Sequence, residues 1–241
     1  MESPKLFEAI LYEELLPTFC SHPNGQYQAT AFRRESVCIS EVDAFDFVRA
    51  WQAGLITPTE KPWLYRCAKS KASEQFFWSG AKQPPPQKIT LWLEPVITVA
   101  ALARLHFDFG WPSDLLGTQA PGFAFDLLCC KPNTDTEVVL GEVKKSTKEV
   151  DQLIEYMHKF GRDPSAATPI NAKEQNAYNK VAALREATAP ILWVVGPKRY
   201  SKAFRVKRAG KKIDLTSAPE SVLLFANYVG PDPPQRNAVP S

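Results

Sequence analysis

The sequence predicts an α/β protein in which a mixed central β-sheet is flanked by helices. The 241-residue chain has 44% hydrophobic and 23% charged residues, which is ordinary globular composition. After residue 86, apolar runs typical of buried strands alternate with segments of helical apolar spacing. Their order is helix, strand, turn, strand, helix, helix, strand, and this order favours a sheet covered by helices. The length allows one large domain or two small ones.

The first 86 residues are predicted to be a mixed α and β region. Residues 6–16 and 42–55 have the apolar spacing of helices, and residues 27–39 and 63–67 resemble strands. The triplet Pro84–Pro86 is the clearest break in the chain and marks the expected domain boundary. No residue pattern in this region indicates a chemical reaction, so its role stays open.

The predicted core covers residues 87–228. Pro95 suits the first turn of a helix that runs to about Phe107. Residues 123–131 and 137–145 are expected to form two strands joined by a turn at Pro132–Asp135.

Two further helices and a strand complete this core. Ser146 and Glu149 have the spacing of a capping box at the start of a helix. Residues 171–188 form the next predicted helix, and the apolar run 191–195 a buried strand. Residues 229–241 are rich in Pro and polar residues and are expected to be a flexible tail. The first of these helices buries an i, i+3, i+4, i+7 stripe of Val150, Leu153, Ile154 and Met157.

The cysteines and the N-terminal segment indicate a reduced, cytoplasmic protein. None of the five cysteines forms a C-x-x-C motif, and Cys129 and Cys130 would point to opposite faces of a strand. A disulfide framework and a structural zinc site are therefore not expected. Residues 1–16 carry acids where a signal peptide needs a basic start, and no apolar run approaches membrane-spanning length, so we expect no membrane partner.

Three polar residues in the predicted strands carry the most information about function. Glu142 and Lys144 are two residues apart on one strand, so both side chains leave the same face. The adjoining strand brings Asp126 alongside them. Two carboxylates and an ammonium on one face suit a divalent cation, because Mg²⁺ favours carboxylates together with waters and phosphate oxygens. A lysine beside that ion can orient a water and stabilise charge on a phosphate. Lys145 would point to the other face, toward solvent or a phosphate.

This arrangement resembles the PD-(D/E)XK, or restriction-endonuclease-like, nuclease superfamily over residues 92–195. The resemblance implies a restriction-endonuclease-like core, Mg²⁺ or Mn²⁺ bound by Asp126 and Glu142, and Lys144 assisting the attacking water. Phe125 stands where the family name has Pro. Glu142-Val143-Lys144 is the only such triplet that ends in a lysine in this chain. The plain structural alternative is a half-buried edge strand whose charges are solvated.

The same resemblance assigns three supporting residues. An acid on the preceding helix is a further metal ligand in many members, and Glu94 occupies that position. The following helix carries a Gln-x-x-x-Tyr pair in the recombination and repair subset, and Gln152 and Tyr156 match it at i, i+4 spacing. Two of them have a structural alternative: a helix-start acid for Glu94 and packing for Tyr156. No Ser-His-Asp order, P-loop or Rossmann glycine pattern occurs.

A cluster of positive charge near the C-terminus is the candidate nucleic-acid contact. Net charge is only +3, but residues 198–212 hold eight basic residues and no acid. Residues 204–215 are predicted to form a hairpin about the turn Ala209–Gly210, which sets Lys207 against Lys212 and Arg208 against Lys211. Such a tip is either a solvated turn or a polyanion contact. The candidate contacts are Lys198, Arg199, Lys202, Arg205, Lys207, Arg208, Lys211 and Lys212.

These observations predict a Mg²⁺- or Mn²⁺-dependent phosphodiesterase that acts on nucleic acid, with DNA as the expected substrate. Restriction, phage defence, transposition and repair are all compatible with such a nuclease. The alternatives are a non-catalytic nucleic-acid-binding subunit and a protein-interaction module built on residues 1–86. A homodimer is compatible with cutting both strands of a duplex, and a protein partner could bind through the N-terminal region.

Overall fold

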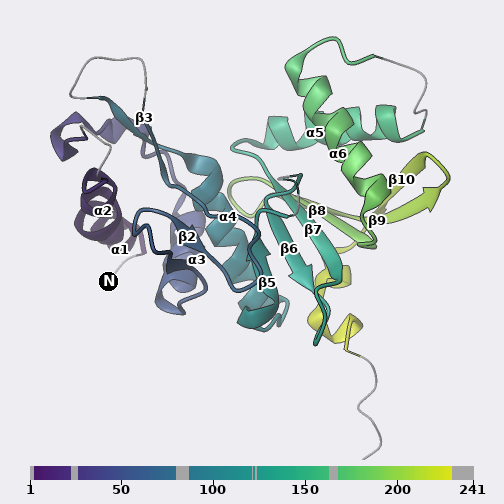
Figure 1. Cartoon of the computed structure of the whole chain (residues 1–241), viewed down its shortest axis with the longest axis horizontal. Coiled ribbons are helices and arrows are strands. Elements are labelled where there is room, and N and C mark those ends of the chain that lie inside the picture. The colour runs from purple at the N-terminus through teal and green to yellow at the C-terminus, as the bar shows by residue number, and fades with distance from the viewer. Residues whose placement is uncertain are drawn as a thin grey trace, which may run out of the picture.

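A six-stranded mixed β-sheet forms the centre of the protein, with strand order β10-β9-β8-β7-β6-β5 (Figure 1). The computed structural model describes residues 3–22, 27–79, 87–120, 122, 124–162 and 168–229. Only β7 and β8 pair in parallel, and the other neighbours are antiparallel. The strands are β5 (Leu116–Thr118), β6 (Leu127–Cys130), β7 (Glu137–Val143), β8 (Ile191–Val195), β9 (Ser201–Ala209) and β10 (Lys212–Ala218). The predicted mixed sheet flanked by helices is therefore confirmed.

Helices cover both faces of this sheet because its strands are apolar on both sides. Leu128 and Leu140 face a core shared with α5 (Thr147–Arg162) and α6 (Ala172–Glu186) (Figure 1). Leu127 and Val139, one residue out of phase, face a second core that includes α4 (Leu93–Ala103). Cys129 and Cys130 lie in these two different cores as predicted, and all five cysteines are free.

Helix α5 begins at the predicted Ser146 cap, although Glu149 makes no reciprocal bond of a capping box, and α6 has a cap that was not predicted. Ser146 Oγ accepts a hydrogen bond from the N–H of Glu149 at 3.2 Å ahead of α5. Asn171 Oδ1 accepts from the N–H groups of Lys173 and Glu174 at 3.0 Å each and caps α6. Pro95 sits in the first turn of α4, which continues as a π-helical turn over Arg104–Asp108.

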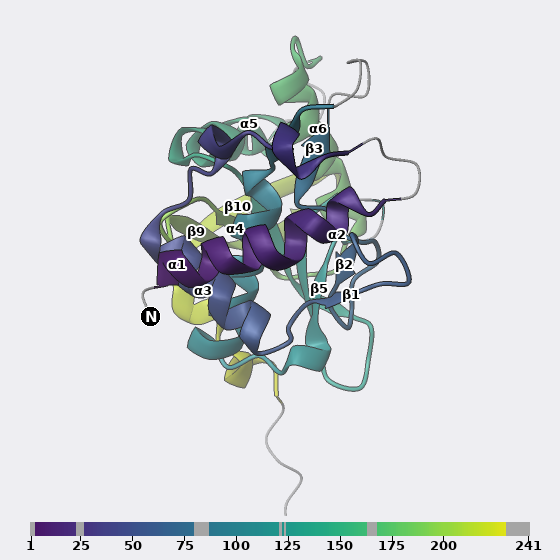
Figure 2. The same cartoon turned by 90° about the vertical axis from the view of Figure 1, so that its left-hand side faces the viewer.

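The N-terminal region packs on the far side of α4 and shares its core. Its apolar side chains, among them Phe7 and Phe47, join Val99 and Trp193 in one cluster. In Figure 2 α1 and α2 run in line across this side of the molecule. The elements are α1 (Ser3–Ala9), a π-helical turn (Ile10–Leu15), α2 (Leu16–Cys20), α3 (Glu41–Gln52), β1 (Thr57–Pro58), β2 (Tyr65–Arg66), β3 (Phe77–Ser79) and β4 (Ile89–Leu91).

Residues 27–39 do not form the predicted strand. They form two 3₁₀ turns, Ala29–Ala31 and Arg34–Ser36, and only Phe32 makes a β-bridge, to Ile89. Ser36 Oγ donates to the carbonyl of Arg33 and accepts from the N–H of Leu91, and such local side-chain bonds compete with a ladder.

Other predicted boundaries change by a few residues. Of residues 63–67 only Tyr65–Arg66 is a strand, and the two core strands are shorter than predicted. Strand β5 was not predicted. The boundary triplet Pro84–Pro86 and residues 230–241 of the tail lie outside the described residues. Within the described part of the chain, no helix is long and apolar enough to cross a membrane.

The basic hairpin is present, but its predicted register is wrong by two residues. Gly210 and Lys211 form the turn, and Lys207 pairs with Asp214 instead of Lys212. Arg208 pairs with Ile213, so the predicted like-charge pairs do not form. The reason is the turn itself: Gly210 has φ +59° and Lys211 does not have positive φ, as in the type II′ turn, which takes glycine at its first central position.

Candidate active site

The end of the β6–β7 pair brings Asp126 and Glu142 together. Leu127 pairs with Gly141, so the same register sets Asp126 opposite Glu142. The N–H of Val143 donates to Asp126 Oδ2 at 2.8 Å and fixes the Asp126 side chain. Lys144 follows β7 directly, and its N–H donates to the carbonyl of Val195 at 2.8 Å, which keeps the backbone extended. The structure thus gathers Asp126, Glu142 and Lys144 as the sequence predicts.

Glu142 is a buried carboxylate held by two lysines. Its side chain is only 2% exposed, and its Oε1 accepts from Lys144 Nζ at 2.6 Å. Lys180 of α6 approaches from the other side, with Nζ 2.5 Å from Oε2. Lys180 also donates to the carbonyl of Ala124 at 2.8 Å. Each oxygen of Glu142 therefore faces an ammonium group.

Lys180 was not among the residues singled out from the sequence. A signal was nevertheless present: it lies between Ala177 and Val181 in the buried stripe of α6, where a lysine is out of place. A buried lysine needs a charged partner, and here the partner is Glu142. The pairing links α6 to β7, two elements whose contact the sequence does not specify.

Burial and neighbouring charges shift the pKa values of both Asp126 and Lys144. Burial and, to a lesser extent, the neighbouring Glu142 raise the pKa of Asp126 to about 7, against the opposing effect of Lys180, Lys144 and the Val143 N–H. Burial alone lowers the pKa of Lys144, but Glu142, Asp126 and Glu94 outweigh it, so that pKa is raised above its ordinary value. Lys144 is therefore an ammonium ion. A cation added beside Asp126 would stabilise the charged form of that carboxyl group.

A cavity of about 200 Å³ adjoins Lys144 and is lined by Glu94, Gln152 and Tyr156 as well. Glu94, in the first turn of α4, places Oε1 3.9 Å from Lys144 Nζ. Gln152 Nε2 donates to Tyr156 Oη at 3.2 Å, as their i, i+4 spacing predicts. Four of the six predicted catalytic residues thus line one cleft.

Cations on the rim of this cleft were not predicted to be there. Lys145 and Lys173 both line it, and Lys173 Nζ donates to Gln152 Oε1 at 2.8 Å. Lys145 was expected on the opposite face of its strand. That expectation is wrong because β7 ends at Val143, so the strict alternation of a strand does not extend to Lys145.

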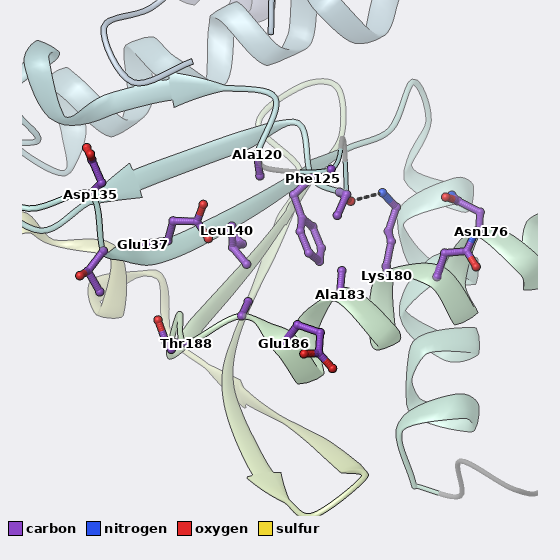
Figure 3. Close-up of a pocket in the computed structure, with 15 residues that line it drawn as sticks. Ala120, Phe125, Asp135, Glu137, Leu140, Asn176, Lys180, Ala183, Glu186 and Thr188 are labelled. Atoms are coloured by element: carbon purple, nitrogen blue, oxygen red, sulfur yellow. Dashed lines mark hydrogen bonds between the residues drawn. The ribbon is translucent and has the colours of Figure 1, made fainter. Parts of the chain in front are cut away.

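A larger cavity of about 810 Å³ lies between α6 and the β6–β7 strands (Figure 3). Phe125 and Leu140 line it on the strand side and Ala183 on α6. Lys180 stands at its edge with its ammonium turned to the carbonyl of Ala124, as the dashed bond in Figure 3 marks. Asn176 lines both cavities, so α6 separates them only in part.

The donor set fits a divalent cation at two of the three predicted ligands. Asp126 and Glu142 face each other across the strand pair, but both oxygens of Glu142 are ion-paired, to Lys144 and Lys180. Glu94 stands apart from them, with the Lys144 ammonium between it and Glu142. Accordingly, no group of three or more His, Cys, Asp or Glu residues in the described ranges is arranged to hold a metal.

The predicted nucleic-acid contacts divide into two sets. Arg199 is bound to the buried Asp46 at 2.6 and 2.7 Å, Lys202 to Asp151 at 2.7 Å, and Arg208 donates to two backbone carbonyls at 2.8 Å. These three side chains therefore have structural partners. The remaining residues are exposed: Lys198, Arg205, Lys207, Lys211 and Lys212.

The tip of the basic hairpin is remote from the carboxylates. Glu142 pairs with Val194, and Val194 pairs with Lys202, so Lys202 lies in the same cross-strand row as Glu142. Lys207 lies five residues beyond Lys202 along β9, which places it roughly 16 Å from Lys202 at ~3.3 Å per residue. The hairpin turn is therefore at the opposite end of the sheet from Glu142, and the cations nearest the cleft are Lys145 and Lys173.

Comparison with family models, curated proteins and solved structures gives no match to this chain. The functional interpretation therefore rests on the chain's own residues and their geometry.

Proposed function

We propose that this protein is a metal-dependent nuclease that hydrolyses phosphodiester bonds of nucleic acid, DNA in the first place, on a restriction-endonuclease-like core. The observation that carries the proposal is the convergence of Asp126, Glu142 and Lys144, of which Lys144 lines the cleft together with Glu94 and Gln152 while the two carboxylates do not line it. The order helix, strand pair, helix, in which these residues lie, supports the same core.

In this proposal Asp126 and Glu142 supply the oxygens that hold Mg²⁺ or Mn²⁺. An ion bound there would act as a Lewis acid toward the phosphate and would lower the pKa of a bound water. Lys144 remains protonated, because the surrounding carboxylates raise its pKa. Its role is therefore to orient the water by donating a hydrogen bond and to stabilise negative charge on the phosphate, and not to act as a base.

The other cleft residues would position the substrate. Gln152 and Tyr156 are linked by a hydrogen bond and present polar groups to the cleft. Lys145 and Lys173 on its rim would neutralise the flanking phosphates. Glu94 would bind the ion through a water, because Lys144 lies between it and Glu142.

One observation favours a second candidate, a non-catalytic nucleic-acid-binding or protein-interaction subunit on the same fold. Both oxygens of Glu142 are already paired with ammonium groups, an arrangement that is electrostatically satisfied without a metal. Ion binding at Glu142 requires the Lys144 ammonium to leave Oε1. In a subunit without activity this closed ion pair would simply persist.

The test is incubation of the protein with linear duplex, circular duplex and single-stranded DNA, each with Mg²⁺, Mn²⁺ or EDTA. We expect cleavage of at least one substrate with either ion and none with EDTA. Lys144→Ala is expected to lower the rate at least a hundredfold, whereas Lys148→Ala, on the exposed first turn of α5, is a matched control that keeps the rate. Absence of cleavage in every condition, or cleavage that persists in EDTA, contradicts the proposal.

A further inference from the structure

Two tryptophans stand out on the surface of the β3–β4 ribbon. Trp78 is 56% exposed and Trp92 is 46% exposed, although both rings are large and apolar. The neighbouring Phe77 and Leu91 point the other way and are buried at 2% and 4%. Alternation holds within Phe77–Ser79 and Ile89–Leu91, but Phe76, directly opposite Trp92, is buried at 1%. The outer face therefore presents the Trp78 ring and part of the Trp92 ring to solvent.

The backbone register relates Trp78 to Trp92 across the ribbon. Trp78 pairs with Thr90, and the N–H of Trp92 donates to the carbonyl of Phe76 at 2.8 Å, so the pairing extends one step past β4. Trp92 is therefore the diagonal neighbour of Trp78 on the same face. Diagonal positions in an antiparallel pair lie about 7–8 Å apart, which is within reach of aromatic side chains.

Other exposed aromatic rings in the described part of the chain have a partner, and these two do not. Phe45 and Phe107 both lie against the guanidinium of Arg49, at 5.2 and 4.2 Å from its Cζ atom. Within the described residues neither Trp78 nor Trp92 has a ring or cation contact of this kind. A pair of adjacent, unpartnered indoles is not explained by packing.

The outer face of the ribbon leads directly into the candidate site. Trp92 is the residue before α4, and Glu94, which lines the cleft, is in the first turn of that helix. Lys88 lies on the same outer face, four residues before Trp92 and so about 13 Å away. It is exposed and makes no ion pair with a described residue. In Figure 1 the ribbon lies at the upper left and α5 and α6 at the upper right of the molecule, with α4 between them.

We propose that Trp78 and Trp92 form a stacking platform for the bases of single-stranded nucleic acid that leads to the cleft. This inference rests on the proposed function and adds the class of substrate. Flat, rigid indoles stack on bases of any sequence, and Lys88, beyond Trp78 on the side away from Trp92, supplies a cation for the backbone. Duplex DNA keeps its base faces covered, so only a single strand or an unpaired end can use such a platform.

The experiment measures binding in EDTA, where no cleavage occurs, by fluorescence anisotropy of a labelled 20-nucleotide single strand and of the corresponding duplex. We expect Trp78→Ala and Trp92→Ala each to weaken single-strand binding about fivefold to a hundredfold, in line with the loss of one stacked base. Trp78→Phe should keep most of the affinity, whereas Trp78→Leu, equally apolar but not aromatic, should not. Phe107→Ala removes an exposed ring elsewhere and is the matched control.

The binding measurements test the stacking platform independently of whether the protein cleaves nucleic acid. Unchanged single-strand binding, or an equal loss for strand and duplex, overturns the platform. Loss of self-association in Trp78→Ala, with nucleic-acid binding intact, would show that the indoles bind a second copy of the chain and overturns it as well. Selective loss of single-strand binding by a protein that cleaves nothing in Mg²⁺ supports the platform and refutes the nuclease.

Discussion

Lys180 Nζ lies 2.5 Å from Glu142 Oε2, while Lys144 Nζ lies 2.6 Å from Oε1 of the same carboxylate. Lys180 comes from α6 and Lys144 from the end of β7, so Glu142 ties a helix to the sheet. Glu142 is almost completely buried, and its charge is tolerated only because both ammonium groups are present.

Removal of Lys180 should therefore destabilise the fold. We expect Lys180→Met to lower the free energy of unfolding by about 2–3 kcal/mol, because it leaves Glu142 short of one cation and Ala124 O without its donor. Urea denaturation in EDTA measures this. The double variant Lys180→Met with Glu142→Gln should recover part of the loss, since no buried charge remains. A Lys180→Met protein as stable as the wild type would show that the ion pair contributes nothing.

The raised pKa of Asp126 makes stability depend on pH. The folded-state pKa is about 7, against an ordinary value of 3.8, so this carboxyl group stabilises the fold fully only below pH 3.8 and that contribution disappears as the pH rises through 7. Asp126→Asn has no such dependence and keeps an acceptor for the Val143 N–H.

We thus expect Asp126→Asn to gain stability over the wild type as the pH increases, by about 2 kcal/mol between pH 5 and pH 8. The comparison is made in EDTA by thermal or urea denaturation at each pH. A stability difference that stays constant across this range contradicts the assignment of Asp126 as the titrating carboxyl.

Gln152 should matter for activity more than for stability. It is half-buried at the cleft, and the apolar stripe of α5 does not depend on it. We expect Gln152→Ala to reduce the cleavage rate about tenfold or more and to change the free energy of unfolding by less than about 1 kcal/mol. Leu153→Ala, the adjacent buried residue, is the contrasting control and should cost about 2–5 kcal/mol. A Gln152→Ala protein that unfolds readily yet cleaves normally would place Gln152 in the core.

The cleft cations and the hairpin cations should differ in their effect on binding. The double variant Lys145→Ala with Lys173→Ala should weaken binding and lower the slope of log affinity against log salt by about 0.7 per contact on single strands. Lys207→Ala with Lys211→Ala removes the same charge at the opposite end of the sheet and should leave the slope nearly unchanged. Equal effects in the two variants would mean that nucleic acid also reaches the hairpin tip.

Local patterns in the sequence predict the core well. The Ser146 cap, the stripe of α5 and the i, i+4 pair Gln152–Tyr156 depend on neighbours within a few residues, and each is present. Strand β8 over Ile191–Val195 follows from its apolar run in the same way.

Features that depend on distant parts of the chain are not predicted. Lys180 is defined by its contact with Glu142, which only the packing of α6 on the sheet creates. Strand β5 contains Gly117, whose missing side chain admits the backbone of Lys69, with a Cβ there meeting the Lys69 carbonyl carbon at 2.6 Å. The register of the hairpin follows from the positive φ of Gly210, which the sequence pairing of charges does not reveal.

Titration with Mn²⁺ tests most directly the claim that Asp126 and Glu142 hold a divalent cation. The number of bound ions is followed by the loss of the electron paramagnetic resonance signal of free Mn²⁺. We predict that the wild type binds, that Lys144→Ala binds at least as tightly because Glu142 Oε1 is released, and that Asp126→Asn and Glu142→Gln each bind at least tenfold more weakly. No binding by the wild type, or equal binding by all four proteins, would contradict a metal-dependent site at these carboxylates.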